Sequence, residues 1–310
     1  MHIFLTGPTG FVGSRVLDDL LSAGHKVTAL AHSKRSRAEL QRLYPQVALV
    51  IGDASKAEDI RGIIPPGTDA VLYLPGLLRE FPKRGATFQA VHVEGVRNLL
   101  GEAKRAGVRR WIQMSALGVS ADASTGYFQT KWQAEQLVRQ SELDWTILRP
   151  SVIFDDRPSK QINFVGELAK VIAITPIIPV FGDGQYRMQP VSVDDVSQTT
   201  VQSLVKPETI GKTYELGGPE KLLYVQILRL IARSLGKRRR LIHIPFWIVE
   251  PMAALLQGFT FFPFTLDQLT MLKEENIIHD PDKEPEWRVT FDLPLKQFTV
   301  ALNKAKHSRS

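Results

Sequence analysis

The chain has 310 residues, of which 44% are hydrophobic and 23% are charged, and this composition excludes a largely disordered protein. Lysine and arginine outnumber aspartate and glutamate by 39 to 32, so the formal charge of +7 indicates either a surface kept soluble by charge or an anionic partner. The absence of cysteine excludes disulfides, thiolate nucleophiles and cysteine metal sites.

The types of ligand can be narrowed further. The seven histidines are scattered and none pairs at ligand spacing, so we expect no bound metal. No nucleic-acid motif and no interleaved basic and aromatic run is present, so we expect no nucleic-acid partner. The expected substrate is a small molecule whose identity the sequence does not reveal.

Short apolar runs alternate with amphipathic segments through the first half of the chain. In order they are HIFLT (2–6), FVGSRVLDDLLSAG (11–24), KVTALA (26–31), VALVIGD (47–53), DAVLYLPG (69–76), TFQAVHVEGVRNLLGEAKRAG (87–107), RRWIQMSA (109–116), YFQTKWQAEQLVRQ (127–140) and DWTILRP (144–150). Strands rich in valine, isoleucine and leucine that alternate with helices of about three turns are typical of parallel crossover units. The sequence therefore predicts an α/β fold with a doubly wound parallel sheet, the Rossmann architecture.

The pattern changes after Arg149 and Pro150. The expected later elements are a helix over 160–174, a proline-rich connector over 175–184, a return strand and helix over 188–204, and helices over 222–236, 246–258 and 265–276. We therefore expect two domains, listed by residue number: a dinucleotide-binding domain over 1–154, with 188–205 returning to it, and a smaller, mostly helical C-terminal lobe for substrate or partner over 155–187 and 206–310.

The motif GPTGFVG follows the first strand directly and opens the first helix. Gly7 permits a tight turn, Gly10 lets the backbone approach a pyrophosphate, and Gly13 allows the helix to pack closely on the strand. The helix N-terminus adds unpaired N–H groups and partial positive charge. The residues expected to bind a dinucleotide here are Gly7, Thr9, Gly10, Phe11, Val12 and Gly13. The alternative is that the glycines serve only the turn and the packing.

The end of the second strand bears on which dinucleotide binds. An NAD-selective site places an acidic residue there for the ribose hydroxyls, but this chain has His32, Lys34 and Arg35 instead. Cationic side chains favour a 2′-phosphate, so NADP(H) is the preferred cofactor and NAD(H) the alternative. The same residues would also be explained as solvated cations at the start of a helix.

Two further strand ends contribute candidates for cofactor binding. Asp53 closes the third strand, where it either accepts from the adenine amino group or caps a helix that begins near Ser55. Leu74, Pro75 and Gly76 end the fourth strand, where small residues let a cofactor lie close.

The segment YFQTK places Tyr127 and Lys131 four residues apart, on one face of a helix. A lysine ammonium near a phenol lowers the phenol pKa from about 10, which makes tyrosine a usable proton donor or acceptor near neutral pH. Lysine can also hold the nicotinamide ribose. The alternative is a purely structural pair.

These motifs together resemble the short-chain dehydrogenase/reductase superfamily, in the extended or atypical branch that includes sugar-nucleotide epimerases. The resemblance covers nearly the whole chain, through GPTGFVG, VHVEGVRNLL, RRWIQMSALG, YFQTK, LRPSVIF and KTYELGGPE. The last three motifs, with MQPVSVDDVS, look most like the bacterial relatives of the complex I accessory subunit alpha-subcomplex 9.

The resemblance implies roles for particular residues. Tyr127 would be the catalytic acid or base, Lys131 the ribose anchor, and Ser115 the third catalytic polar residue. Pro150, Ser151 and Val152 would flank the nicotinamide.

Two positions depart from the superfamily pattern. Residues 116–118 read Ala-Leu-Gly where the epimerases usually carry a catalytic serine or threonine, so the alternative for Ser115 is a position on the cofactor side. His92 stands where relatives often have asparagine, and a buried, hydrogen-bonded core histidine is the favoured interpretation.

Two functions fit these residues. The first is an NADP(H)-dependent oxidoreductase or epimerase, and the second is a non-catalytic cofactor-binding module in a respiratory-chain or quinone context, including ubiquinone biosynthesis, as the resemblance implies. We expect a monomer or a homodimer.

The expected location is the cytoplasm, because the first residues, MHIFLTG, are too short and uncharged for a secretion signal. The apolar stretch 246–264 is interrupted by Glu250 and two prolines, so it does not predict a membrane span. Either it contacts the inner membrane face or a respiratory complex peripherally, or Phe246, Trp247, Ile248, Leu255 and Leu256 pack the core of the second lobe, which we favour.

Overall fold

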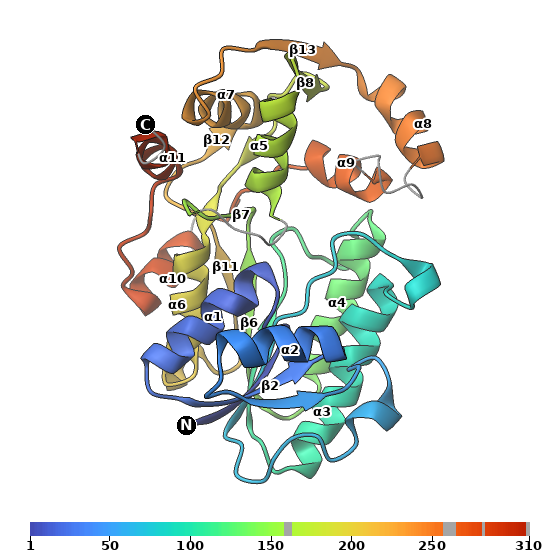
Figure 1. Cartoon of the computed structure of the whole chain (residues 1–310), viewed down its shortest axis with the longest axis vertical. Coiled ribbons are helices and arrows are strands. Elements are labelled where there is room, and N and C mark those ends of the chain that lie inside the picture. The colour runs from blue at the N-terminus through green and yellow to red at the C-terminus, as the bar shows by residue number, and fades with distance from the viewer. Residues whose placement is uncertain (158–162, 257–264, 281–282, 308–310) are drawn as a thin grey trace. The chain divides into compact units, whose positions relative to one another are not determined.

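The structure is a computed structural model that describes residues 1–157, 163–256, 265–280 and 283–307 (Figure 1). The chain forms two units. The first comprises Met1–Arg149 and Val196–Glu215, and the second comprises Pro150–Asp195 and Leu216–Ser310.

A seven-stranded sheet forms the centre of the first unit, in the order β11-β6-β5-β4-β1-β2-β3. Its strands are β1 (His2–Thr6), β2 (Lys26–Ala31), β3 (Ala48–Ile51), β4 (Ala70–Tyr73), β5 (Arg110–Met114), β6 (Asp144–Pro150) and β11 (Lys212–Leu216). All neighbouring pairs from β3 to β6 are parallel, with Leu5 opposite both Ala29 and Leu72. The predicted doubly wound α/β sheet is confirmed, and its strand order reverses between β1 and β4, where such folds bind ligands.

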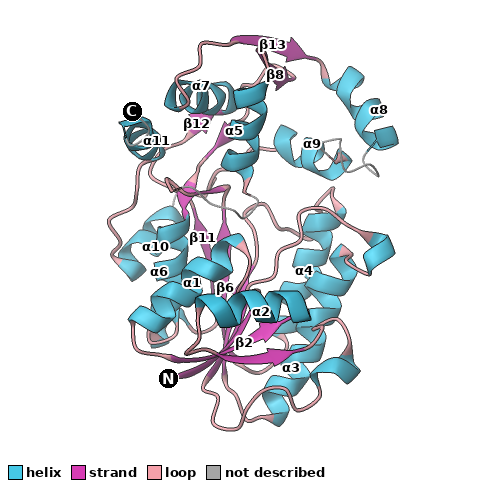
Figure 2. Cartoon of the chain, viewed as in Figure 1, coloured by secondary structure: helices cyan, strands magenta, loops and turns pink. Residues whose placement is uncertain are grey.

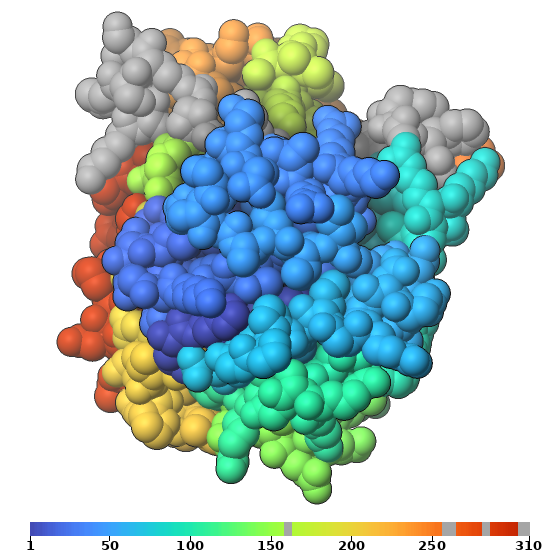
Figure 3. Space-filling model, turned by 60° about the horizontal axis from the view of Figure 1, so that its bottom comes forward, coloured from blue at the N-terminus to red at the C-terminus, as the bar shows by residue number. Residues whose placement is uncertain are grey.

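Helices cover both faces of this sheet (Figures 1 and 2). The helical elements of the first unit are α1 (Phe11–Ser22), α2 (Lys34–Leu43), α3 (Gly95–Arg105), α4 (Gly126–Arg139), α6 (Val193–Ser203), 3₁₀ turns at Ala57–Ile60, Pro82–Arg84 and Pro207–Thr209, and a π-helical turn at Gln89–Glu94. On one face, apolar side chains of α3 and α4 pack against Phe4, Val71 and Trp111, which are fully buried. On the other, Ser197 of α6 donates to Asp19 of α1 over 2.6 Å. The first third of the chain, in blue, forms a closely packed face in Figure 3.

The second unit is mostly helical, with short strand pairs (Figure 2). Its strands are β7 (Ile153–Phe154) with β10 (Val191–Ser192), β9 (Arg187–Met188) with β12 (Leu222–Leu223), and β8 (Ile177–Phe181) with β13 (Arg240–Ile244). Its helices are α5 (Phe164–Ile174), α7 (Tyr224–Ser234), α8 (Phe246–Leu256), α9 (Leu266–Lys273), α10 (Lys283–Phe291) and α11 (Phe298–His307). Within residues 1–157, 163–256, 265–280 and 283–307, we find no helix long and apolar enough to cross a membrane.

The core of the second unit joins helices α5, α7 and α11. Leu168 and Ile172 of α5, Ile227 and Ile231 of α7, and Phe298 of α11 belong to one cluster of buried apolar side chains. The amphipathic patterns of α5 and α7 were visible in the sequence, and burial of their apolar faces against each other holds the unit together.

We expected a proline-rich connector over 175–184, and this prediction is wrong for part of the segment. Residues Ile177–Phe181 form strand β8, which pairs in parallel with β13 over five residues and places Pro179 opposite Ile242. Because each strand of a two-stranded pair keeps an unpaired edge, a proline is tolerated there. The partner strand lies some sixty residues away in the sequence, so no local pattern predicted the pairing.

The domain boundaries of the structure differ from the expected ones. The return to the first unit begins at Val196 and continues to Glu215, beyond the expected 188–205, because β11 adds a seventh strand beside β6. The first unit ends at Arg149 and the second begins at Pro150, whereas the expected boundary followed residue 154. Helix α10 was absent from the expected elements, because KEPEWRVTF has no clear apolar period.

Candidate functional site

The glycine loop connects β1 to α1 by a tight turn. Gly7 has a φ of +72°, and its carbonyl accepts from the N–H of Gly10 over 3.0 Å. A methyl group on Gly13 would lie 1.9 Å from the Gly7 oxygen, so only glycine lets the helix pack against the turn. Helix α1 begins at Phe11, and no side chain caps its first N–H groups. The loop therefore offers backbone donors to an anion, as the sequence motif suggested.

The same edge of the sheet brings further candidate residues together. A methyl group on Gly7 would lie 3.2 Å from the Pro75 nitrogen, so the loops after β1 and β4 are in contact. The Lys131 ammonium donates to the carbonyls of Pro75 over 3.2 Å and of Met114 over 3.1 Å. Gly76 next to this contact is exposed. Gly7, Pro75, Gly76 and Lys131 thus lie around one corner at the carboxyl ends of β1, β4 and β5.

Lys131 is a buried cation to which no carboxylate of the described residues is hydrogen-bonded. Its side chain is 2% exposed, and carbonyls take two of its three N–H donors in the described part of the chain. Burial lowers the pKa of Lys131 to about 8, and the Glu135 carboxylate one turn away opposes this effect. A buried ammonium with one donor left can bind a ligand hydroxyl.

Tyr127 is enclosed by aromatic rings. Its ring meets those of Phe88, His92 and Phe128 edge-on, with centroid distances of 5.7, 5.3 and 5.4 Å. Burial raises the pKa of Tyr127 above its ordinary value. Our expectation that Lys131 lowers this pKa is therefore wrong for the structure, because burial removes the phenolate from water.

His92 is a buried core histidine, as we favoured from the sequence. Its Nε2 accepts from the N–H of Leu77 over 3.2 Å, and its Nδ1 lies 3.0 Å from the Thr130 hydroxyl, which itself donates to Gly126. These contacts define a neutral ring with the proton on Nδ1. Burial, with a smaller contribution from Lys131, lowers the pKa of His92 to about 2. The ring holds the Leu77 backbone in place beside Gly76.

A π-helical turn sets the position of His92. The Tyr73 hydroxyl donates to the Val91 carbonyl over 2.5 Å, and the Gly95 N–H then bonds to Ala90 one residue further back. A methyl group on Gly95 would lie 2.2 Å from the Tyr73 oxygen. Tyrosine at the end of β4 and glycine on the helix therefore create the wide turn together, and the sequence showed neither partner of this pair.

Ser115 belongs to a buried ion-pair network. Its hydroxyl donates to Glu135 over 2.6 Å, and Glu135 is fully buried. Arg149 donates to both oxygens of Glu135, over 2.8 and 2.7 Å. Burial would lower the pKa of Arg149, but Glu135 and Glu215 raise it overall. Sequence reasoning missed Glu135 and Arg149, although Glu135 lies four residues after Lys131 on the same helix.

The cations expected at the end of β2 are on the surface. Ser33 caps α2 through Ser36, so Lys34 and Arg35 lie in the first turn, and His32 just precedes it. All three of these side chains are exposed. The first turn contains no acidic residue, so the positive charges face the positive end of the helix dipole. This arrangement is mildly unfavourable in the absence of an anion.

Asp53 closes a local turn. Its Oδ1 accepts from the backbone and the hydroxyl of Ser55, over 3.0 and 2.7 Å. The helix we expected near Ser55 begins two residues later, as the 3₁₀ turn Ala57–Ile60 with Lys56 in the cap position. The side chain of Asp53 therefore caps the turn and not the helix.

The residues expected beside the nicotinamide are held by an asparagine. Pro150 begins the second unit. Within that unit, the Ser151 hydroxyl and the Val152 N–H donate to Asn276 Oδ1 over 2.6 and 2.9 Å. Asn276 lies far along the sequence, and nothing there marked it as a partner.

The parallel sheet, the glycine turn at its switch point and the uncapped helix define a dinucleotide-binding Rossmann domain. A family model described as NAD(P)H-binding matches residues 7–207. The chain belongs to this NAD(P)H-binding family.

Its relatives agree with the resemblance seen in the sequence. The mitochondrial NADH-ubiquinone oxidoreductase 40 kDa subunit of Neurospora crassa is 26% identical over 95% of this chain and 75% of that protein. The NADH dehydrogenase [ubiquinone] 1 alpha subcomplex subunit 9 of Arabidopsis thaliana is 26% identical over 88% of this chain and 70% of that protein. A short-chain dehydrogenase/reductase superfamily protein from Agrobacterium tumefaciens, solved with bound NAD, superposes with a TM-score of 0.73 at 21% identity, over 100% of this chain and 97% of that one.

Proposed function

We propose that the first unit binds NADP(H) and that the chain is an oxidoreductase or epimerase acting on a small carbonyl or alcohol. The observation that carries this proposal is the corner at which the glycine loop, the Pro75 carbonyl and the Lys131 ammonium meet. A structural role alone does not explain why a cation is buried there against backbone carbonyls only.

The chain's own residues would divide the work of binding. The amides of Gly10, Phe11 and Val12 bind the pyrophosphate, and the missing side chains of Gly7 and Gly13 let it approach. Lys131 donates its remaining N–H to the nicotinamide ribose. The nicotinamide supplies or accepts a hydride when the cofactor is bound.

NADP(H) is favoured over NAD(H) by the surface charges at α2. Lys34 and Arg35 face the helix dipole without an acidic neighbour in the first turn, and a 2′-phosphate would relieve this repulsion. Thr9, His32, Asp53 and Leu74 are proposed to complete the adenosine side of the site.

Tyr127 is the proposed proton donor. Because burial raises its pKa, the phenol keeps its proton at neutral pH and can give it to a carbonyl oxygen during reduction. Ser115 acts on this site through Glu135, which it helps to hold one helical turn from Lys131.

The proposal is tested by changing Tyr127 to Phe and measuring cofactor affinity and turnover together. We expect affinity to stay within about twofold and turnover to fall at least about 100-fold, because only the proton donor is removed. Tyr44→Phe is the matched control, since its hydroxyl bonds to Asp18 on the outer side of the same unit. Equal turnover in the Tyr127 variant and the parent would overturn the catalytic assignment.

The second candidate is a non-catalytic cofactor-binding module in a respiratory-chain or quinone context, including ubiquinone biosynthesis. Two observations favour it: the Neurospora crassa and Arabidopsis thaliana relatives described above are respiratory-complex subunits, and the Tyr127 side chain is only 6% exposed. A cofactor that binds only the folded chain at about one hundred times its Kd stabilises it by about 2.7 kcal/mol, so retention without turnover is useful. A parent protein that binds NADPH but turns over no carbonyl, quinone or nucleotide sugar would favour this module.

A further inference from the structure

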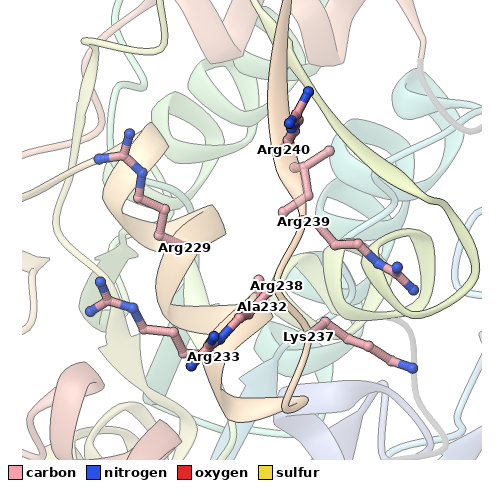
Figure 4. A pocket seen from close by; sticks show the side chains of 8 residues that line it. Arg229, Ala232, Arg233, Lys237, Arg238, Arg239 and Arg240 are labelled. Carbon is pink, nitrogen blue, oxygen red and sulfur yellow. The ribbon is translucent and has the colours of Figure 1, made fainter.

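Six cations surround a hollow in the second unit. The hollow has a volume of about 350 Å³ and is lined by Arg229, Arg233, Lys237, Arg238, Arg239 and Arg240, together with Ile178 and Ala232. Figure 4 shows Arg229 and Arg233 projecting from α7 and the others from the segment that leads into β13. No acidic residue lines it. None of these six side chains forms an ion pair or hydrogen bond with a residue that the structure describes.

The six cations that line the hollow, called the rim below, come from two elements and are therefore more than the end of one helix. Four consecutive cations, Lys237–Arg240, follow α7 directly, and Arg229 and Arg233 lie one turn apart on the helix itself. Arg187 is not part of the rim. It is paired with Glu275 through two contacts of 2.6 and 2.8 Å. The remaining unpaired charge calls for an anionic partner.

Helix α8 follows the rim along the chain and exposes apolar side chains. Trp247 is 74% exposed, Leu255 78%, Met252 47% and Ile248 38%. With the exposed Pro251 they occupy one arc of roughly 140° on the helix, and no charged residue lies within that arc. This reverses the usual pattern of a surface helix, which turns its polar face to water.

The buried side of α8 explains why the arc stays outside. Val249 and Ala253 pack into the core of the unit, and Phe246 packs against the same core. Glu250 lies on this side and pairs with Lys273. Our favoured interpretation of the stretch 246–264 as core is therefore right for Phe246 but wrong for Trp247, Ile248 and Leu255. Residues 257–264 and the side chain of Leu256 lie outside the described residues.

The rim and helix α8 lie at one end of the second unit. Strand β13 connects the two, and Figure 1 shows α7, β13 and α8 following one another along one end of the second unit. We propose that this surface docks on a bilayer that contains anionic phospholipids, with the rim at the headgroup phosphates and the apolar arc of α8 in the interface. Tryptophan, leucine and methionine beside a cluster of arginines match a surface that is anionic outside and apolar just beneath.

Charge complementarity selects the bilayer over a second copy of the chain. A symmetric contact centred on this surface would bring the rim close to its own copy, and twelve cations without acidic partners would repel one another. A bilayer supplies both an anionic plane for the rim and an apolar layer for α8. The inference does not depend on the proposed oxidoreductase.

The test is sedimentation of the full chain with phosphatidylcholine vesicles, with and without phosphatidylglycerol, at low and high salt. We expect binding only to the vesicles with phosphatidylglycerol, weakened by salt. Lys237→Glu with Arg238→Glu should reduce partitioning at least about tenfold, and so should Trp247→Ser with Leu255→Ser. All four side chains are exposed, so the fold should persist, as circular dichroism and the cofactor-induced rise in Tm would show.

Two matched double variants separate this surface from general charge and hydrophobicity. Lys56→Glu with Arg61→Glu changes the net charge equally in the first unit, and Val205→Ser with Val289→Ser removes side chains that are 62% and 80% exposed elsewhere. Both controls should bind within about twofold of the parent. The proposal is overturned if the controls weaken binding as much, if the parent does not sediment with phosphatidylglycerol at low salt, or if inorganic phosphate binds the rim while vesicles do not.

Discussion

Lys131 and Glu135 lie one turn apart on α4 and are both buried, but they differ in their hydrogen-bond partners. Glu135 is surrounded by donors, with Arg149 on both oxygens, Arg139 at 3.4 Å and Ser115 at 2.6 Å. Among the residues that the structure describes, Lys131 donates to two backbone carbonyls, and its pKa is lowered to about 8. We propose that the paired carboxylate of Glu135 holds the fold, and that Lys131, with one N–H donor left, binds a ligand.

The largest loss of stability should come from breaking the ion pair between Glu135 and Arg149. Glu135→Gln leaves Arg149 buried with only Glu215 at 3.6 Å, and we expect a loss of about 3 kcal/mol in the free energy of unfolding. Glu142→Gln is the control, since that side chain is 87% exposed and its pair with Lys104 is worth under about 1 kcal/mol. Urea denaturation measures both. Equal stabilities for the two variants would show that the Glu135 network does not hold the fold.

Removing the charge of Lys131 should leave stability intact and weaken cofactor binding. Lys131→Met relieves a buried ammonium, so the free energy of unfolding should stay the same or rise, while the affinity for NADPH should fall at least about tenfold. Lys104→Met, with a side chain 48% exposed, serves as the control for the loss of a lysine. For each variant, calorimetric titration measures the affinity for NADPH and urea denaturation measures the free energy of unfolding. A stability loss with unchanged affinity would reverse the assignment of Lys131.

The same comparison predicts a dependence on pH. The folded pKa of Lys131 is about 8, below the ordinary value of 10.5, so between these values the unfolded chain holds the extra proton. The free energy of unfolding attributable to Lys131 should therefore rise with pH over this window, by about 3 kcal/mol at most, while NADPH affinity declines above about pH 8. The difference between parent and Lys131→Met, followed from pH 7 to 10, isolates this group. Parallel curves for the two proteins would contradict the lowered pKa.

The smallest change in cofactor affinity should come from Lys34 and Arg35, whose side chains are exposed to water. Lys34→Ala with Arg35→Ala should weaken NADPH by about tenfold and leave NADH nearly unchanged, because only the 2′-phosphate is lost as a partner. Arg42→Ala, in the last turn of the same helix, should change neither. Thermal shifts with each cofactor rank the affinities. An equal fall for NADH and NADPH would show that these residues do not choose between them.

The local parts of the site could be predicted from the sequence. The Gly7 turn, the close packing at Gly13 and the strand series depend on backbone sterics and on the period of apolar residues, which short segments already carry. The same is true of His92 as a core histidine, since an imidazole within an apolar helix face is most often buried.

The contacts that give the site its chemistry could not be predicted in this way. Lys131 meets Pro75 across 56 residues and Met114 across 17, and both contacts depend on which strands become neighbours in the sheet. The pKa of Tyr127 was expected to fall and instead rises, because the side chain is buried, in part by Phe88 and His92 from a segment some 35 residues earlier in the chain. The outward face of α8 was expected to be buried, because an apolar segment does not state which of its sides has a partner.

The sequence by itself determined that this chain forms a parallel sheet with a tight glycine turn after its first strand, since backbone conformation and apolar periodicity are local properties. Only the tertiary structure decided which buried charge is paired, how far burial shifts the pKa of each buried group, and which apolar side chains remain in water. These depend on desolvation and on partners distant in the chain, and both are fixed only when the strands and helices have packed.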